Sequence, residues 1–249
     1  MMWRRNACLL VLPLRTPDDR QVPIGLICTD MDRTLTDRSL RVVPAAMVAL
    51  DRARKHGIRI VLATGRTPKE LGRRGDFIRH FDAVVVEGGA LYGDPHHLKP
   101  LSPHPHLVDE LALWLEKQAI EYRRGALAIS VPRNADRALR RFGNVKRFNL
   151  IPNHDRIDVT LAGVDKGRAL RRLVKERFTD VHGRRLAFAD GENDISLFEA
   201  SHYRVAVQNA VPELKKKAHE VLDGYGGRAV ASFLGTRLLP SVHGRRLGK

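Results

Sequence analysis

Cysteine is scarce in this chain of 249 residues, which contains only Cys8 and Cys28. Two thiols are too few for the disulfide framework of a small secreted protein, so that class is excluded. Cys28 lies in an apolar stretch, where a free cysteine usually behaves as a small buried hydrophobic residue. A reducing compartment, the cytoplasm, is therefore the expected location.

Long apolar runs are also missing. No stretch reaches the roughly eighteen consecutive apolar residues that a transmembrane helix needs, so no membrane span is predicted. The start of the chain resembles a signal peptide, but Pro13 and Arg15 interrupt its apolar part and no small-residue cleavage site follows. We expect residues 1–23 to form a poorly ordered or loosely docked extension. A later translation start is the alternative, because the α/β pattern begins only at Val22.

Acidic side chains are outnumbered, since 28 Asp and Glu stand against 44 Lys and Arg and give a formal net charge of +16. A charge of this size attracts polyanions and steers small anionic substrates toward a protein. Aromatic residues make up only 6% of the chain, and none are interleaved with a basic patch as in many RNA-binding domains. A small anionic substrate is the favoured interpretation, and a nucleic-acid-associated protein is the alternative.

An apolar run over 24–28 predicts a buried strand that ends at two carboxylates, Asp30 and Asp32. Such strands are typical of parallel sheets that are covered on both faces. Ligands of these sheets bind beyond the carboxyl ends of the strands. Two like charges this close raise each other's pKa, and a bound cation removes the repulsion. Carboxylate oxygens suit Mg²⁺, whereas a solvated turn is the alternative for this tripeptide alone.

A helix is predicted over 44–57 and a second strand over 58–63, which ends at Thr64-Gly-Arg66. A strand, a helix and a strand at this spacing form a right-handed crossover, which brings both loops to one edge of the sheet. The hydroxyl of Thr64 can donate to a phosphate oxygen, and Gly65 lets the backbone approach closely. Arg66 can add a charge-assisted contact or face solvent.

Two later segments carry further polar groups. Lys166 begins a predicted helix, where the helix dipole disfavours a cation unless its side chain points at an anion. Asp190 and Asp194 follow a predicted strand over 186–189, with Asn193 between them. These carboxylates are expected at the same edge of the sheet as Asp30.

Residues 91–163 break this pattern, because a helix over 107–119 is followed by short strands rather than by another crossover. They predict a small open α+β unit. Four histidines near its start are expected to be solvated loop residues rather than zinc ligands, since no thiol accompanies them and their spacing fits no common zinc pattern. These are His96, His97, His104 and His106. Residues 236–249 form a basic tail without a motif and are expected to be disordered.

The first two motifs resemble those of the haloacid dehalogenase (HAD) superfamily of phosphohydrolases. Asp30-Met-Asp-Arg-Thr-Leu-Thr36 is similar to the D-x-D-G-T-L-T signature, with Arg33 where the family usually has Gly. Thr64-Gly-Arg66 is similar to motif two. The turn over 87–90 resembles the E-N-G-A turn of Cof-like members, for which a structural role is expected.

The last two motifs resemble motifs three and four of the same superfamily. Lys166 matches the lysine that binds phosphate and restrains the nucleophile. Asp190-Gly-Glu-Asn-Asp194 is similar to the G-D-x-x-N-D form of motif four, with Ala189 in place of its Gly. The four motifs in this order identify the chain as a Cof-like, subfamily IIB member, closest in size to archaeal phosphoglycolate phosphatases.

The resemblance implies a nucleophile at Asp30 and a general acid and base at Asp32, with Mg²⁺ as cofactor. The backbone carbonyl of Asp32 is also expected to meet the ion. The implied site residues are Asp30, Asp32, Thr64 and Lys166 in catalysis; Thr64, Gly65, Arg66, Lys166 and Asn193 in binding of substrate and phosphate; and Asp30, Asp32, Asp190 and Asp194 as metal ligands.

The implied fold class is α/β, a Rossmann-like core with a parallel sheet and a small α+β cap inserted between motifs two and three. Because 36–64 holds only one helix and one strand, the cap is expected over 91–163. The core is then expected over 24–90 and 164–235.

The implied substrate is a small phosphomonoester, phosphoglycolate or a similar compound, hydrolysed by a monomer or a homodimer. A sugar-phosphate phosphatase or a phosphomutase is the alternative. A second anionic group on the substrate would need cations from the cap, and the candidates are Lys99, Arg123, Arg124 and Arg133.

Overall fold

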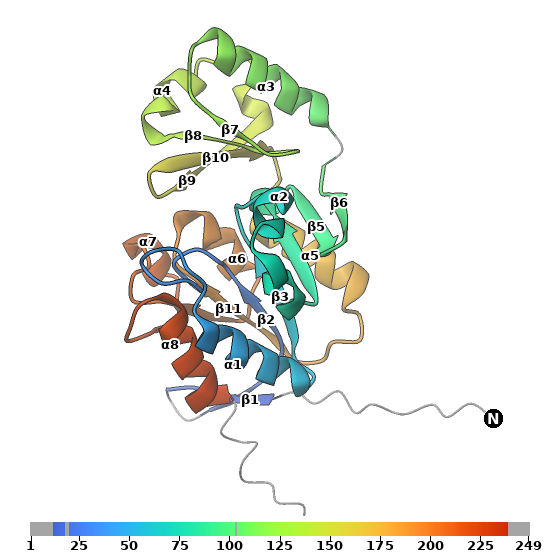
Figure 1. Cartoon of the computed structure of the whole chain (residues 1–249), viewed down its shortest axis with the longest axis vertical. Coiled ribbons are helices and arrows are strands. Elements are labelled where there is room, and N and C mark those ends of the chain that lie inside the picture. The colour runs from blue at the N-terminus through green and yellow to red at the C-terminus, as the bar shows by residue number, and fades with distance from the viewer. Residues whose placement is uncertain (1–11, 18–19, 103, 239–249) are drawn as a thin grey trace, which may run out of the picture.

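The computed structural model describes residues 12–17, 20–102 and 104–238, which form a larger core and a smaller cap above it (Figure 1). The core is built around one nine-stranded sheet in the order β13-β12-β11-β2-β3-β4-β5-β6, with β1 beside β2. Its strands are β1 (Leu12–Arg15), β2 (Gln21–Thr29), β3 (Arg59–Ala63), β4 (Ala83–Val86), β5 (Leu91–Asp94), β6 (His97–Pro100), β11 (Arg184–Ala189), β12 (Tyr203–Ala206) and β13 (Glu220–Val221).

The central strands β11, β2, β3 and β4 run parallel, so their carboxyl ends lie at one edge of the sheet. Both faces are buried, because alternate residues enter two different hydrophobic clusters. In β3, Ile60 packs with α1 (Pro44–Lys55) and α8 (Gly226–Phe233), while Val61 packs with α5 (Lys166–Arg177) and α6 (Ile195–Glu199). The remaining core helices are α2 (Pro68–Gly72) and α7 (Pro212–Lys215). The predicted α/β class with a largely parallel sheet is confirmed.

Residues 91–100 belong to the core sheet, not to the cap in which the sequence placed them. They form β5 and β6, an antiparallel hairpin that extends the sheet beyond β4. Tyr92 is buried in the hydrophobic cluster that also contains the inner face of α5. A hairpin at a sheet edge interrupts the strand–helix–strand pattern just as a domain boundary does, which explains the error.

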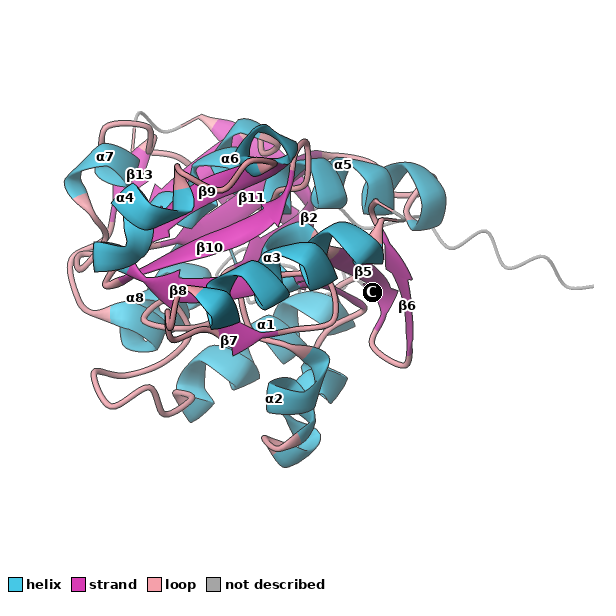
Figure 2. Ribbon diagram, turned by 90° about the horizontal axis from the view of Figure 1, so that it is seen from above, coloured by secondary structure: helices cyan, strands magenta, loops and turns pink. Residues whose placement is uncertain are grey.

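The cap contains a four-stranded antiparallel sheet in the order β7-β8-β10-β9, with two helices on the side away from the core (Figures 1 and 2). Its apolar face packs against these helices in a separate hydrophobic cluster. The opposite face is turned toward the core. The elements are α3 (Pro105–Lys117), β7 (Arg123–Arg124), β8 (Ile129–Pro132), α4 (Asp136–Leu139), β9 (Phe148–Asn153) and β10 (Arg156–Leu161).

Both ends of the chain contribute more to the core than the sequence indicated. β1 pairs antiparallel with the first half of β2, and Leu14 is fully buried, so this part of the expected extension is packed. The segment η6 (Leu234–Leu238) contains the first residues of the expected tail, and Leu238 is also fully buried. Leu12 and Leu14 of β1 and Leu238 of η6 are buried in the main hydrophobic cluster of the core. Cys8 and residues 239–249 lie outside the described residues.

None of the helices in the described part of the chain is long and apolar enough to cross a membrane. Cys28 is fully buried, as expected. The histidines His96, His97, His104 and His106 are all exposed.

Candidate functional site

The loops that follow β2, β3 and β11 meet beneath the cap and form the floor of a cavity of about 420 Å³. Seven predicted site residues line it, and the cap supplies the opposite wall. These seven are Asp30, Asp32, Thr64, Gly65, Arg66, Asp190 and Asn193. The other two, Lys166 and Asp194, are buried directly behind the floor. The tertiary structure therefore brings all nine predicted site residues to one place.

Lys166 connects two of the carboxylates. Its Nζ donates to Oδ1 of Asp30 at 2.7 Å and to Oδ1 of Asp194 at 2.6 Å, and the residue is only 1% exposed. The sequence predicted that the side chain of Lys166 points at an anion, and the carboxylates of Asp30 and Asp194 are such anions within the protein itself. Asp165 caps the start of α5 by accepting from the backbone N–H of Arg168 at 2.7 Å. A Cβ on Gly167 would lie 2.0 Å from the carbonyl oxygen of Ser196, so α5 packs closely on α6 and holds the lysine in place.

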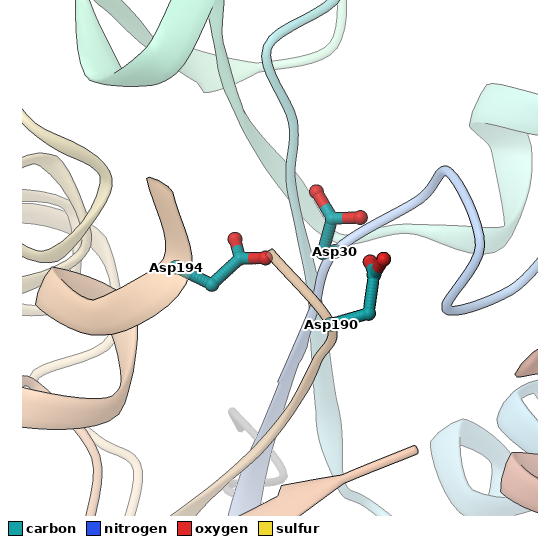
Figure 3. A group of neighbouring side chains, drawn as sticks. All are labelled: Asp30, Asp190 and Asp194. Carbon is teal, nitrogen blue, oxygen red and sulfur yellow. The ribbon is translucent and has the colours of Figure 1, made fainter. Parts of the chain in front are cut away.

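Asp30, Asp190 and Asp194 form a buried cluster, shown in Figure 3, in which each offers one oxygen within 4.8 Å of the others. Among the described residues it is the only such group of histidines, cysteines and acids that could hold a metal ion. The loop after β11 orients its members, because the backbone N–H of Gly191 donates to Oδ2 of Asp194 at 3.0 Å. Thr34 donates to Oδ1 of Asp190 at 2.9 Å.

The electrostatics of the cluster favour a bound cation. Burial raises the pKa of Asp30 well above that of a free aspartate; Lys166 opposes this rise, and the charges of Asp194 and Asp190 add to it. Burial also raises the pKa of Asp190. For Lys166 burial alone would lower the pKa, but the carboxylates of Asp194 and Asp30 outweigh it and raise the pKa. Three carboxylates stand against one ammonium group, so the site carries excess negative charge when they are ionised.

The donor set fits a hard divalent cation. All three groups offer carboxylate oxygens, the ligands that such ions prefer. Oδ2 of Asp190 is buried without a hydrogen-bond partner, an arrangement that costs free energy unless a ligand satisfies it. Nε2 of His154, from the cap, lies at ion-pair distance from this oxygen, 3.3 Å. That contact raises the pKa of His154.

Asp32 lies beside this cluster but is not a member of it. Its two carboxylate oxygens accept from Nε and Nη2 of Arg66 at 2.7 and 2.9 Å, a bidentate ion pair. Arg66 is half-buried in the cavity wall, and this pair uses two of its five N–H groups, so its predicted contact with phosphate stays a prediction. Oγ1 of Thr64 accepts from the backbone N–H of Arg66 at 3.2 Å, which leaves its hydroxyl hydrogen available to another acceptor.

Comparison with known proteins identifies the family. The sequence profile of the family described as haloacid dehalogenase-like hydrolase matches residues 27–122 and 139–234.

The chain belongs to the haloacid dehalogenase-like hydrolases.

Relatives and solved structures agree with this assignment. The chain is 30% identical over 218 residues to a phosphoglycolate phosphatase of Archaeoglobus fulgidus, covering 84% of this chain and 96% of the relative. It is 26% identical to a phosphoglycolate phosphatase of Sulfurisphaera tokodaii, covering 84% and 92%. A haloacid dehalogenase-like hydrolase from B. subtilis has a similar fold, with a TM-score of 0.72, 19% identity and coverage of 86% and 99%. A subclass IIB sugar phosphatase has a TM-score of 0.63, 18% identity and coverage of 80% and 93%. The predicted superfamily is confirmed.

In this hydrolase the cap contributes residues that the sequence reasoning missed. Ser130, Asn153, His154, Arg156 and Asp158 all line the cavity. A signal for two of them was available, because β10 alternates polar and apolar residues, which places the polar ones on one face of the strand. The orientation of that face toward the core is a property of the tertiary structure.

The four candidate cap cations are not equivalent. Arg123 and Arg124 line the cavity, and Arg124 is ion-paired with Asp109. Lys99 lies in the core hairpin and pairs with Glu176 at 3.6 Å. Arg133 pairs with Glu192 at 3.3 Å, and neither Lys99 nor Arg133 lines the cavity.

The unusual Arg33 of motif one joins the core to the cap. Its backbone has a φ of 61°, a left-handed conformation that favours the glycine usual in this family. Its Nη1 lies 3.0 Å from Nδ1 of His154, in the turn between β9 and β10. Arg33 is thus the first member of a chain of contacts that passes through His154 to Asp190.

Proposed function

We propose that this hydrolase is a Mg²⁺-dependent phosphatase that cleaves a small phosphomonoester through a covalent aspartyl phosphate on Asp30. By family and relatives it is a phosphoric monoester hydrolase. The observation that carries the proposal is the buried Asp30, held by Lys166 at 2.7 Å and clustered with Asp190 and Asp194 at the floor of a cavity.

Asp30, Asp190 and Asp194 would hold the ion. When bound, Mg²⁺ would neutralise charge on the carboxylates and on the phosphoryl group, which is what phosphoryl transfer mainly requires. Oδ2 of Asp190 supports this assignment, because it is buried without a hydrogen-bond partner and has only the imidazole of His154 at ion-pair distance. Participation of the backbone carbonyl of Asp32 as a further ligand stays a prediction.

The protein residues would divide the reaction into two displacements. A carboxylate oxygen of Asp30 forms a bond to phosphorus while the bond to the leaving oxygen breaks, and Asp32 gives its proton to that oxygen. A water molecule then forms the new bond to phosphorus, the bond to Asp30 breaks, and Asp32 takes the proton from the water. Arg66 would hold Asp32 in place through its bidentate contact in the second displacement, when Asp32 is ionised and accepts the proton of the water.

The remaining site residues would bind the transferring group. Lys166 lies between two carboxylates and would offer its third N–H to a phosphoryl oxygen. Thr64 and the backbone at Gly65 would bind other oxygens, since the hydroxyl hydrogen of Thr64 is available there. Asn193 would order the loop that carries Asp190.

Two substrate classes are candidates. Phosphoglycolate or an ester of similar size is suggested by the names of the relatives, and Arg123 in the cavity wall could meet a carboxylate. A sugar phosphate is favoured by a specific observation, the carboxylate of Asp158 in the same wall. A phosphomutase would share every core residue but would retain the phosphate on its product. A cytoplasmic location and a monomeric or homodimeric state stay predictions.

The test is phosphate release from phosphoglycolate and several sugar phosphates, with and without Mg²⁺. Wild type is expected to release phosphate only with Mg²⁺, and Asp30→Asn is expected to release none, because an amide cannot replace the nucleophile. Asp32→Asn should lower kcat by about 10² to 10⁴-fold. The exposed Asp223→Asn is the matched control and should behave as wild type. Full activity in Asp30→Asn would refute the mechanism.

A further inference from the structure

The wall of the cap that faces the site presents a row of three polar side chains. In the cap sheet Arg123 is paired with Ser130, and Ser130 with Asp158, so the three lie side by side across β7, β8 and β10. Residues directly opposite on neighbouring strands share one face of a sheet. All three line the cavity, whereas Val131 and Ile157, next to them on β8 and β10, are buried in the core of the cap.

Asp158 is the end of this row that reaches the phosphate-binding loop. Its Oδ2 lies 3.3 Å from the position that a Cβ on Gly65 would occupy. The same oxygen accepts from Nδ2 of Asn153 at 2.8 Å and from Nδ2 of Asn193 at 3.3 Å. Asn193 belongs to the metal-binding loop of the core, so Asp158 stands where cap, phosphate loop and metal loop meet.

The hydrogen-bond donors around Asp158 are neutral groups, namely the amides of Asn153 and Asn193 and the hydroxyl of Ser130. Arg156, the arginine of β10, does not contact Asp158. It donates to Oγ of Ser130 at 2.9 Å and to the backbone oxygen of Ser130 at 2.6 Å. The backbone of Arg123 lies two strands away from that of Asp158, which is about 10 Å at normal strand spacing. The group next to the phosphate loop is therefore a carboxylate that no guanidinium contacts directly.

We propose that Asp158 is a specificity-determining residue, whose carboxylate accepts a hydrogen bond from a hydroxyl group of the leaving group and excludes a carboxylate from the same position. This inference rests on the proposed function, since it concerns the leaving group of that reaction. A hydroxyl group on the second carbon of the leaving group would donate a hydrogen bond to the carboxylate of Asp158. A carboxylate group at the same position would be repelled by the like charge of Asp158. The substrate class is then a phosphate ester of a polyol or sugar rather than of a short carboxylic acid.

Three small esters isolate this interaction. Ethyl phosphate has neither group, 2-hydroxyethyl phosphate has a hydroxyl, and 2-phosphoglycolate has a carboxylate on an otherwise similar two-carbon chain. For wild type with Mg²⁺ we expect kcat/KM for 2-hydroxyethyl phosphate to exceed that for 2-phosphoglycolate by at least about tenfold, since like-charge contacts are strongly disfavoured. In Asp158→Asn the ratio should fall by about tenfold or more, through a lower KM for 2-phosphoglycolate.

The matched control is Asp155→Asn, an exposed carboxylate of the same hairpin that does not line the cavity. It should keep the wild-type ratio. Partial unfolding of a variant lowers the active fraction equally for both esters, so it does not change the ratio of their kcat/KM values. A wild-type preference for 2-phosphoglycolate, or an unchanged ratio in Asp158→Asn, would overturn the inference.

Ethyl phosphate separates this inference from the proposed function. Its hydrolysis by wild type supports the phosphatase mechanism whichever ester is preferred. If wild type hydrolyses none of the three, the proposed function fails, and calorimetric affinities for the same esters decide the inference. Tighter binding of 2-hydroxyethyl phosphate than of 2-phosphoglycolate would support it, and the reverse order would overturn it.

Discussion

Lys166 illustrates how one residue holds the site together. A buried ammonium group is costly unless its charge is compensated, and here both Asp30 and Asp194 accept from it. The same contacts fix the position of the proposed nucleophile. The lysine thereby stabilises the free enzyme and prepares the site for an anion.

Replacement of this lysine by methionine should leave the buried carboxylates of Asp30 and Asp194 without their cation. We expect Lys166→Met to lower the free energy of unfolding by about 3–5 kcal/mol, the usual cost of breaking a buried ion pair. Urea denaturation without divalent ions measures this. Lys117→Met, an exposed position at the end of α3, is the control and should change little. Equal stabilities of the two variants would show that the contacts of Lys166 are not maintained in solution.

Asp158 should make stability depend on pH. Burial raises its pKa, against the hydrogen bond from Asn153 and the charge of Lys166. A carboxyl group whose pKa is higher in the folded than in the unfolded state contributes stability below its unfolded pKa of about 3.9, and this contribution is lost as pH rises through the raised value. Asp158→Asn does not titrate, so it should gain stability relative to wild type as pH rises.

Thermal unfolding near pH 4 and near pH 7 tests this expectation. The melting temperature of Asp158→Asn relative to wild type should be higher at the upper pH, by roughly 2–4 °C for each kcal/mol gained. Asp155→Asn should show no such change. A difference that stays constant with pH would indicate that Asp158 is not desolvated in solution.

At the scale of elements, the turn after β4 attaches the cap to the core. Glu87 lies in η2 (Glu87–Gly89), and its carboxylate accepts from the backbone N–H groups of Ala126 and Leu127 at 2.9 and 2.8 Å. These amides belong to the cap loop between β7 and β8. The structural role expected for this turn is therefore a link between the two units.

Removal of that carboxylate should loosen the cap. We expect Glu87→Ala to cost about 3 kcal/mol, since two backbone donors lose a charged acceptor. Hydrogen exchange at Ala126 and Leu127 should become faster, while exchange within β2 stays slow. Glu121→Ala, at an exposed position of the cap, provides the comparison. Unchanged protection of both amides would mean that other contacts hold this loop.

At the scale of the whole molecule, the net charge of +16 should act on the approach of substrate. Long-range attraction raises association rates and is screened by salt, with a Debye length of about 10 Å at 0.1 M. We expect kcat/KM for a phosphoester to fall several-fold between about 0.02 M and about 0.3 M salt, with kcat nearly unchanged. Steady-state kinetics at constant Mg²⁺ measure both. Salt-sensitive binding of DNA or RNA that persists in Asp30→Asn would instead favour the nucleic-acid alternative.

The sequence by itself determined the strands of the parallel sheet and the polar residues at their ends. Apolar runs such as 24–28 are local signals, and parallel connections bring their carboxyl ends to one edge whatever the details of packing. That is why Asp30, Thr64 and Asp190, far apart in the chain, could be assigned to one site.

Only the tertiary structure decided the boundary of the cap and the contacts across it. These contacts include the addition of the β5–β6 hairpin to the core sheet and the pairing of β1 with β2. They also include the orientation toward the core of the β10 face that carries Asp158. The same holds for the ion pair of Asp32 with Arg66. Antiparallel partners and side-chain pairs are chosen by register and by the packing of two units, and no local periodicity records that choice.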